Sequence, residues 1–204
     1  NESNIRQRFS HAIRINPNTP LNLYLQLTPG QNMAKASKNH AADITVFKDH
    51  SYLDGINIVK LTAGQIVAPL DVVVSANDEP DHGLDIGLFS DSKTQYGQQY
   101  GFGPQPFGNP NLAYGTQAPF HMGFYHEADI IFAAGGFLKR TYPEFRIHLF
   151  KRLAEFAFKT NHPYWGWRFM GLGLHYVGDF SNPYHVTPVP GNSTISTIWV
   201  GLLN

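Results

Sequence analysis

The sequence predicts a mainly α-helical fold for residues 1–204, arranged as one domain with a small irregular or β-containing N-terminal part. Apolar residues recur at helical spacing over 127–139 and 141–160, and a nearly continuous apolar stretch covers 165–179. Hydrophobic residues make up 42% of the chain, which is enough for a sizeable core. The helices are therefore expected to pack around one another in the C-terminal two thirds of the chain.

Residues 1–61 are expected to form an N-terminal appendage to the helical part. Leucine alternates with other residues over 21–27, which is the period of a short strand. Two further apolar runs, 44–47 and 56–59, flank the turn pair Asp54-Gly55 and predict a β-hairpin.

An acidic cluster follows the next predicted helix, which covers about residues 63–76. Pro69 favours a kink or a later start of this helix. Asp78, Glu79 and Asp81 come directly after it. Carboxylates are unfavourable at a helix C-terminus, where the dipole attracts cations, so the cluster indicates a bound cation. A solvated helix end is the alternative.

Residues 82–119 are predicted to form a long irregular insertion, rich in glycine, proline and aromatic residues. Long loops in compact domains are usually functional or disordered. The aromatic residues favour order because they can bury surface, so we expect a packed lid or wall. Composition does not distinguish a wall that holds a lipid from one that stacks a base.

The stretch 165–185, WGWRFMGLGLHYVGDFSNPYH, contains the clearest chemical pattern. His175 and Asp179 are four residues apart, so they lie on one face of a helix. Pro183 ends that helix, and the turn before it lets His185 fold back toward the same face. Imidazole and carboxylate groups are zinc ligands. A surface ion pair is the alternative, but a helix apolar on nearly all sides is expected to be buried, where a carboxylate needs a partner.

The segment GLGLHYVGDFSNPYH resembles the zinc-dependent phospholipase C and single-strand-specific nuclease superfamily, whose signature is an apolar helix carrying LHYxGDxxxPxH. The resemblance covers about residues 163–186. It implies a helical bundle, up to three zinc ions and export from the cell. It also implies that His175, Asp179 and His185 bind zinc, with Asp179 bridging two ions.

The resemblance further implies a zinc-binding Asp at the end of an earlier helix and a zinc-binding His beside aromatic residues. We assign the first to Asp78, with Asp81 as the substitute, and the second to His121, with His126 as the substitute. A histidine that only packs in an aromatic cluster is the alternative for either of the last two. An early histidine binds a third metal in the family, and His11 is the less certain counterpart because the residues after it do not look helical.

The expected function is hydrolysis of a phosphate ester, a phospholipid or a nucleotide phosphodiester, by a zinc-activated water. The resemblance implies that Asp78 and Asp179 are the catalytic residues. The 15 basic and 15 acidic residues give no net charge, which argues against duplex nucleic acid as a binding partner. No run of 18 apolar residues occurs, so no transmembrane segment is expected.

Residues 186–204 depart from the family pattern. They lack the His and Glu, four residues apart, that complete its second zinc site. Because the sequence stops in an apolar run, we expect the polypeptide to continue or to be a piece of a longer one. Two alternatives follow: a zinc-binding structural or binding module of the same superfamily without turnover, and a helical interaction protein without metal.

Overall fold

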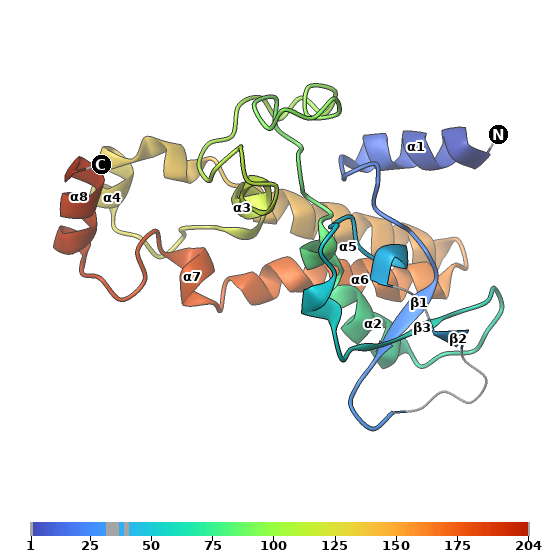
Figure 1. The fold of residues 1–204 in the computed structure, drawn as a ribbon. Helices are drawn as coiled ribbons and strands as arrows, with labels where there is room; N and C mark the ends of the chain where they lie inside the picture. Colours follow the sequence, from blue (N-terminus) through green and yellow to red (C-terminus); the bar gives the residue numbers. More distant parts are fainter. Residues whose placement is uncertain (1, 32–36, 39–40, 204) are drawn as a thin grey trace. The chain divides into compact units, whose positions relative to one another are not determined.

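The structure, a computed structural model, describes residues 2–31, 37–38 and 41–203 and is mainly α-helical, as predicted (Figure 1). The chain forms two compact units, Asn1–Asp85 with His148–His175 and Ile86–Ile147 with Tyr176–Asn204. The division falls inside α5 (Pro143–Lys159) and α6 (Pro163–Asp179), so both long helices contribute to both units.

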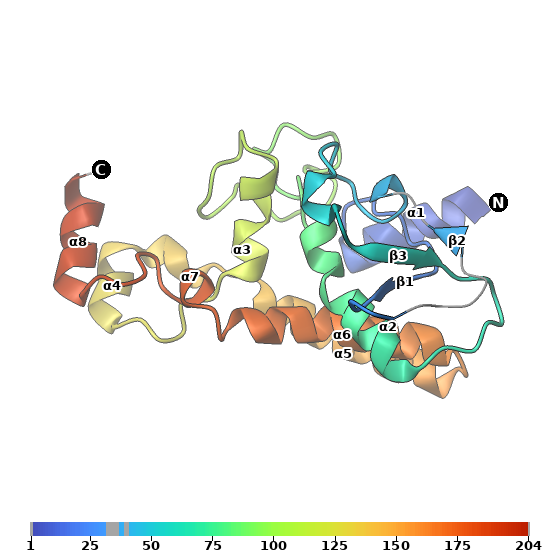
Figure 2. The ribbon, with the colours of Figure 1, turned by 60° about the horizontal axis from the view of Figure 1, so that its bottom comes forward.

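A small antiparallel sheet lies beside α2 (Pro69–Asn77) in the first unit (Figure 2). Its central strand, β3 (Asn57–Lys60), pairs with β1 (Tyr24–Leu27) on one side and with β2 (Ser37–Lys38) on the other. Strand β1 confirms the strand pattern of the leucine repeat. The helix α2 starts at Pro69, the later of the two predicted starts.

The predicted hairpin between residues 44–47 and 56–59 is wrong. Residues 44–47 form no strand, and the short 3₁₀ turns η1 (Ala41–Asp43) and η2 (Ser51–Leu53) occupy this region. Pairing with β1 is preferred because it buries Val59 with Leu25, Leu27 and Val72 in one apolar cluster. Local turn signals could not reveal this long-range pairing.

The N-terminal helix α1 (Glu2–Ile13) was not predicted, and His11 does lie on a helix. Its apolar residues Ile5, Phe9 and Ile13 recur every four residues and therefore share one face. Ile13 is buried, and the Phe9 ring lies 6.4 Å from the ring of Phe169. Contact with α6 thus stabilises a helix whose pattern is too short to recognise in the sequence.

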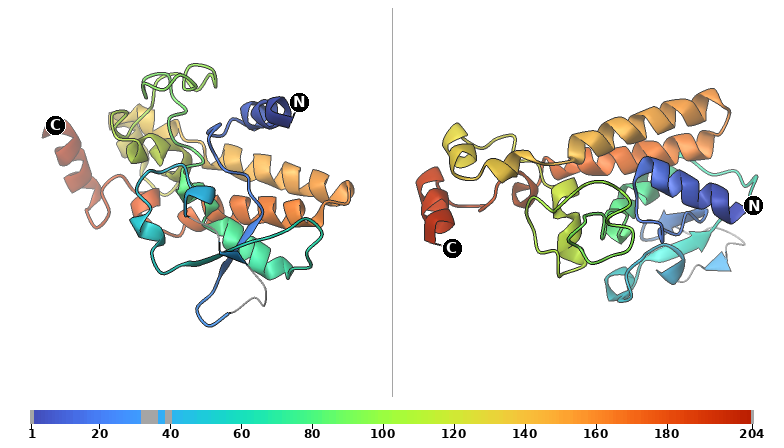
Figure 3. Two further views of the ribbon diagram at one scale, coloured as in Figure 1. Left: turned by 45° about the vertical axis from the view of Figure 1, so that its right-hand side comes forward. Right: turned by 90° about the horizontal axis from the view of Figure 1, so that it is seen from above.

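The helices α5 and α6 lie side by side and antiparallel, joined by the turn 160–162 (Figure 3). Within the first unit, α6 also packs closely on α2. A Cβ added at Gly171 would lie 2.5 Å from the carbonyl oxygen of Val73 and 2.7 Å from the Cβ of Ala76. The expectation that α6 is buried all round is wrong, because Met170 and Leu174 are exposed on its other face.

We expect Gly171→Ala to lower the free energy of unfolding by about 1–3 kcal/mol, because backbone atoms of α2 cannot yield to the added methyl group. Gly178→Ala on the same helix is the matched control, since its Cβ would meet nothing within 4 Å. That variant should gain up to about 1 kcal/mol from helix propensity. Urea unfolding measures both, and equal effects would show that the α2–α6 contact is not tight.

Four aromatic rings pack together in the second unit, and two of them come from the 82–119 segment. The rings of Phe89, Phe102, Phe120 and Tyr142 lie with centroids 5.0–5.9 Å apart. The segment is irregular, as predicted, apart from the end of η3 (Glu79–His82), the turn η4 (Tyr114–Gln117) and the start of α3. Phe89 and Phe102 are buried, whereas Tyr114 is exposed. That the segment forms a lid or wall over the site stays a prediction.

Short helices complete the second unit: α3 (Ala118–His121), α4 (Asp129–Ala134), η5 (Gly136–Lys139), α7 (Pro183–Val186) and α8 (Thr194–Leu203). The helix predicted over 127–139 is broken into α4 and η5 because Gly135-Gly136 interrupts it. The unpredicted α8 lies beside α4 (Figure 3). Within the part of the chain that the structure describes, no helix combines the length and apolarity needed to cross a membrane.

Candidate functional site

The helix α6 carries two of the predicted ligands in its last two turns, His175 in the first unit and Asp179 in the second. The other predicted ligands divide between the units in the same way. The first unit holds Asp78 and Asp81, and the second holds His121 and His185. In the first unit, Asp81 and His175 offer a carboxylate and an imidazole of the kind that binds metal ions, and His121 offers an imidazole in the second.

His175 is held in one orientation by the backbone of α2. Its Nδ1–H donates to the carbonyl oxygen of Asn77 at 2.8 Å. In the neutral ring, Nε2 is therefore the lone-pair atom, and it lies 3.7 Å from Oδ1 of Asp81. The separation is too long for a hydrogen bond, and an imidazole nitrogen and a carboxylate oxygen are both groups that bind zinc.

Asp81 is the carboxylate beside His175, whereas Asp78 is held by the sheet. Asp78 is the C-cap residue of α2, and its Oδ2 accepts a hydrogen bond from Nε2 of Gln26 at 2.7 Å. Gln26 lies on β1, where its backbone N–H donates to Oγ of Ser75. The structure thus favours the substitute that the sequence offered, Asp81, as the partner of His175 in the first unit.

A buried ion pair fixes the turn η3, which carries Asp81, against α6. Arg168 donates from Nε to Oε2 of Glu79 at 2.9 Å and from a terminal nitrogen to Oε1, and it also donates to the carbonyl of Asn22 at 2.7 Å. Burial alone would lower the pKa of Arg168, but the Glu79 carboxylate raises it above its ordinary value. Sequence reasoning missed this pair, although a single arginine in an apolar helix was a signal that it needs a partner.

A second set of contacts holds the other end of η3 at His82, which sequence reasoning also missed. The Tyr52 hydroxyl donates to Oγ1 of Thr45 at 2.7 Å and therefore accepts from Nδ1 of His82 at 3.3 Å. Oγ1 of Thr45 donates to the His82 carbonyl at 3.0 Å. Burial lowers the pKa of His82, although the charges of the nearby acidic residues act in the opposite direction. The turn that presents Asp81 is thus held at both ends.

In the second unit, the two oxygens of Asp179 face two different histidines. Oδ2 lies 3.2 Å from Nδ1 of His121, and Oδ1 lies 4.0 Å from Nε2 of His185. Two atoms bound tetrahedrally to one zinc ion at its usual bond lengths lie about 3.3–3.6 Å apart. Nδ1 of His121 and Oδ2 of Asp179 are within hydrogen-bond distance, and the 4.0 Å between Oδ1 and His185 is longer than that range. His121 and Asp179 are both buried.

The turn after α6 brings His185 back toward Asp179, as the sequence predicted. Asn182 caps α7 by accepting a hydrogen bond from the backbone N–H of Tyr184 at 3.0 Å. The backbone N–H of Gly123 donates to the His185 carbonyl at 2.9 Å, which ties α7 to the segment after α3. A Cβ at Gly123 would lie 2.4 Å from the ring of Tyr125 and 2.9 Å from the ring of Phe180, so a larger residue would require these rings to shift.

The less certain ligands lie on the surface. His126 is exposed in the turn after α3, and His11 is exposed in the last turn of α1. Their assignment as metal ligands stays a prediction. The assignment of His121, which packs beside the buried ring of Tyr176 at 5.2 Å, gains from its contact with Asp179.

Comparison of the chain with models of known protein families, with curated proteins and with solved structures gives no match. The resemblance to the phospholipase C and nuclease superfamily therefore depends on the motif around His175. What the structure adds is the local geometry of two groups of potential metal ligands, one in each unit.

Proposed function

We propose that this protein is a zinc-dependent hydrolase of phosphate esters, acting on a phospholipid headgroup or a nucleotide phosphodiester. The observation that carries the proposal is the Asp179 carboxylate, whose two oxygens face His121 and His185 separately. A carboxylate that bridges metal ions needs this arrangement, and the motif resemblance assigns the same role to Asp179.

The donor set fits zinc in both units. Imidazole nitrogens together with carboxylate oxygens are its usual ligands, and the chain has no cysteine. Calcium and magnesium prefer shells made of oxygen atoms, so three histidines favour zinc over either. His175 and Asp81 fit such a site, since Nε2 of His175 lies 3.7 Å from Oδ1 of Asp81.

Zinc, when bound, acts as a Lewis acid toward phosphate and lowers the pKa of a bound water. The protein's own residues would orient these groups. Asn77 fixes the ring of His175, and the Glu79–Arg168 pair fixes the turn that carries Asp81. The Asp81 side chain is 56% exposed, so it can accept a proton from water at the site. We therefore propose Asp81 for the catalytic role that the sequence assigned to Asp78.

Comparison of Asp81→Asn with Asp78→Asn tests that assignment. Asp81→Asn should weaken zinc binding about tenfold or more, because a direct carboxylate ligand loses its charge. Asp78→Asn should change the affinity less, since the new amide oxygen still accepts the hydrogen bond from Gln26. Competition with a chromophoric chelator measures both affinities. A larger loss in the Asp78 variant would identify Asp78 as the ligand instead.

The second candidate function is zinc binding without turnover. It is favoured by residues 186–204, which contain no His, Asp or Glu and so provide no side-chain ligand for a second zinc site of the family type. Assays of the zinc-loaded protein with bis-p-nitrophenyl phosphate, a short-chain phospholipid and a single-stranded oligonucleotide distinguish the two. Hydrolysis that a chelator abolishes and zinc restores supports the hydrolase. Bound zinc without hydrolysis of any of the three selects the binding module.

A further inference from the structure

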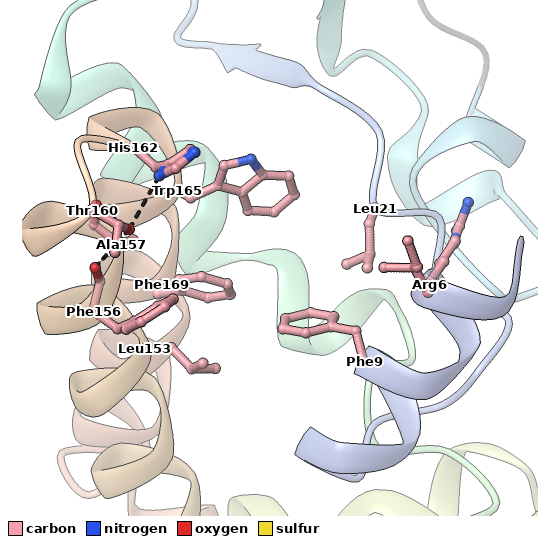
Figure 4. Close-up of a pocket in the computed structure, with 11 residues that line it drawn as sticks. Arg6, Phe9, Leu21, Leu153, Phe156, Ala157, Thr160, His162, Trp165 and Phe169 are labelled. Atoms are coloured by element: carbon pink, nitrogen blue, oxygen red, sulfur yellow. Dashed lines mark hydrogen bonds between the residues drawn. The ribbon is translucent and has the colours of Figure 1, made fainter. Parts of the chain in front are cut away.

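The first unit contains an apolar cavity of about 920 Å³ between α1 on one side and α5 and α6 on the other (Figure 4). This volume is at the upper end for small-molecule sites, which are usually apolar with a few polar groups. Its walls combine side chains from all three helices with Leu21 from the segment before β1 and with Thr160 and His162 from the turn between α5 and α6.

The cavity lies away from His175 along α6. Trp165 and Phe169 line it from the first half of α6, whereas His175 lies at least six residues further along. Six to ten helical residues correspond to about 9–15 Å along the helix axis. The cavity is therefore a separate feature of the first unit, and what it binds does not depend on the proposed hydrolase function.

The rim leaves large apolar side chains exposed to water. Ile5 on α1 and Phe156 on α5 are each 65% exposed, while Phe169 and Ala157 are buried behind them. In Figure 4 the rings of Phe9 and Phe169 point toward each other, and their centroids lie 6.4 Å apart. An apolar ligand of elongated shape would remove this surface from water, at a gain of roughly 25 cal/mol per Å².

The charge of the lining is one-sided. Arg6 is cationic, and its guanidinium donates to the carbonyl oxygen of Thr19 at 2.6 Å, which holds it at the α1 side. Among the lining side chains that the structure describes, none is a carboxylate. His162 and Thr160, hydrogen-bonded to each other at 3.1 Å, supply further polar atoms at the end of α5. An apolar cavity with one fixed cation is complementary to an apolar chain with an anionic head.

We propose that this cavity binds a fatty acid, with its aliphatic chain against Phe9, Phe156 and Phe169 and its carboxylate at Arg6. A carboxylate fits because the guanidinium offers paired donors in the geometry that a carboxylate accepts. A saturated aliphatic chain fits because the lining is mainly aromatic and aliphatic and requires few hydrogen bonds from a ligand.

Titration of the protein with decanoate and with the uncharged decanol tests this. One readout is tryptophan fluorescence, to which Trp165 in the cavity wall contributes, and the other is calorimetry. Phe156→Asp places a charge in the chain-binding wall and should weaken decanoate binding about tenfold or more. Ile66→Asp is its control, since Ile66 is 95% exposed and outside the cavity. Arg6→Gln should weaken decanoate about threefold to tenfold and leave decanol unchanged, whereas Arg8→Gln should change neither.

Three results would overturn the proposal. The first is the absence of saturable decanoate binding to the parent protein. The second is an equal effect of Phe156→Asp and Ile66→Asp, or an equal effect of Arg6→Gln on decanoate and decanol. The third is a concentration-dependent dimer that Phe156→Asp dissociates, because a second copy of the chain would then cover this surface. If Phe156→Asp does not fold, the comparison of Arg6→Gln with Arg8→Gln decides.

Discussion

Replacing Glu79 with alanine is expected to lower the free energy of unfolding by about 3–5 kcal/mol, because it leaves the Arg168 guanidinium buried without its counter-charge. Both side chains of the pair are almost fully buried, at 3% and 2% exposure. The two hydrogen bonds between them join η3 to α6. Loss of the pair should also weaken zinc binding, since the turn that carries Asp81 is no longer fixed. Urea denaturation gives the stability change.

An exposed ion pair in the same unit provides the control. Arg152 and Glu155 lie 3.4 Å apart on α5 with side chains 82% and 39% exposed. Glu155→Ala should cost at most about 0.5 kcal/mol. The double variant Glu79→Ala with Arg168→Met should recover part of the loss, because no buried charge remains. If Glu79→Ala costs no more than Glu155→Ala, the pair does not hold the two elements together.

Asp179→Asn is expected to remove most of the stabilisation that zinc gives to the folded protein. Asparagine keeps the size and one oxygen acceptor, but it loses the charge that two imidazoles face. Zinc at about a hundred times its Kd adds about 2.7 kcal/mol to stability, and a hundredfold weaker site retains only about 0.4 kcal/mol of that. Hydrolysis should fall further than binding of a substrate analogue, since the metal acts on charge that develops in the transition state.

Thermal melts of parent and variant with and without zinc measure this effect. Asp129→Asn is the control, because Asp129 lies in the same unit on the first turn of α4, outside the group around Asp179. Its zinc-dependent shift in Tm should equal that of the parent. An Asp179→Asn variant with the parental shift would mean that Asp179 is no ligand, and the interpretation of residues 165–185 would be wrong.

The helices with long apolar periods could be predicted from the sequence because their signals are local. The segments 141–160 and 165–179 became α5 and α6 within a few residues of the predicted ends. The sheet was harder to predict from the sequence, since β1 and β3 are separated by about thirty residues and no local signal marks their pairing. Helix α1 was missed because three apolar residues in twelve leave its period too weak to distinguish.

The candidate site was predictable where its residues share one motif. A helix and the capped turn that follows it position His175, Asp179 and His185, and local signals in the sequence predict both elements. The sequence could not show which of Asp78 and Asp81 lies beside His175, because this depends on how the 3₁₀ turn η3 directs each side chain. The Glu79–Arg168 pair joins residues 89 positions apart, so only the folded chain reveals it.

The most direct test of zinc binding is the metal content of the protein purified without chelators, measured by inductively coupled plasma mass spectrometry. We expect at least one zinc ion per chain that dialysis does not remove, with zinc in excess over calcium and magnesium. Metal content near zero, together with an unchanged Tm when zinc is added, would contradict it and leave His175 and Asp179 as structural residues of a helical protein.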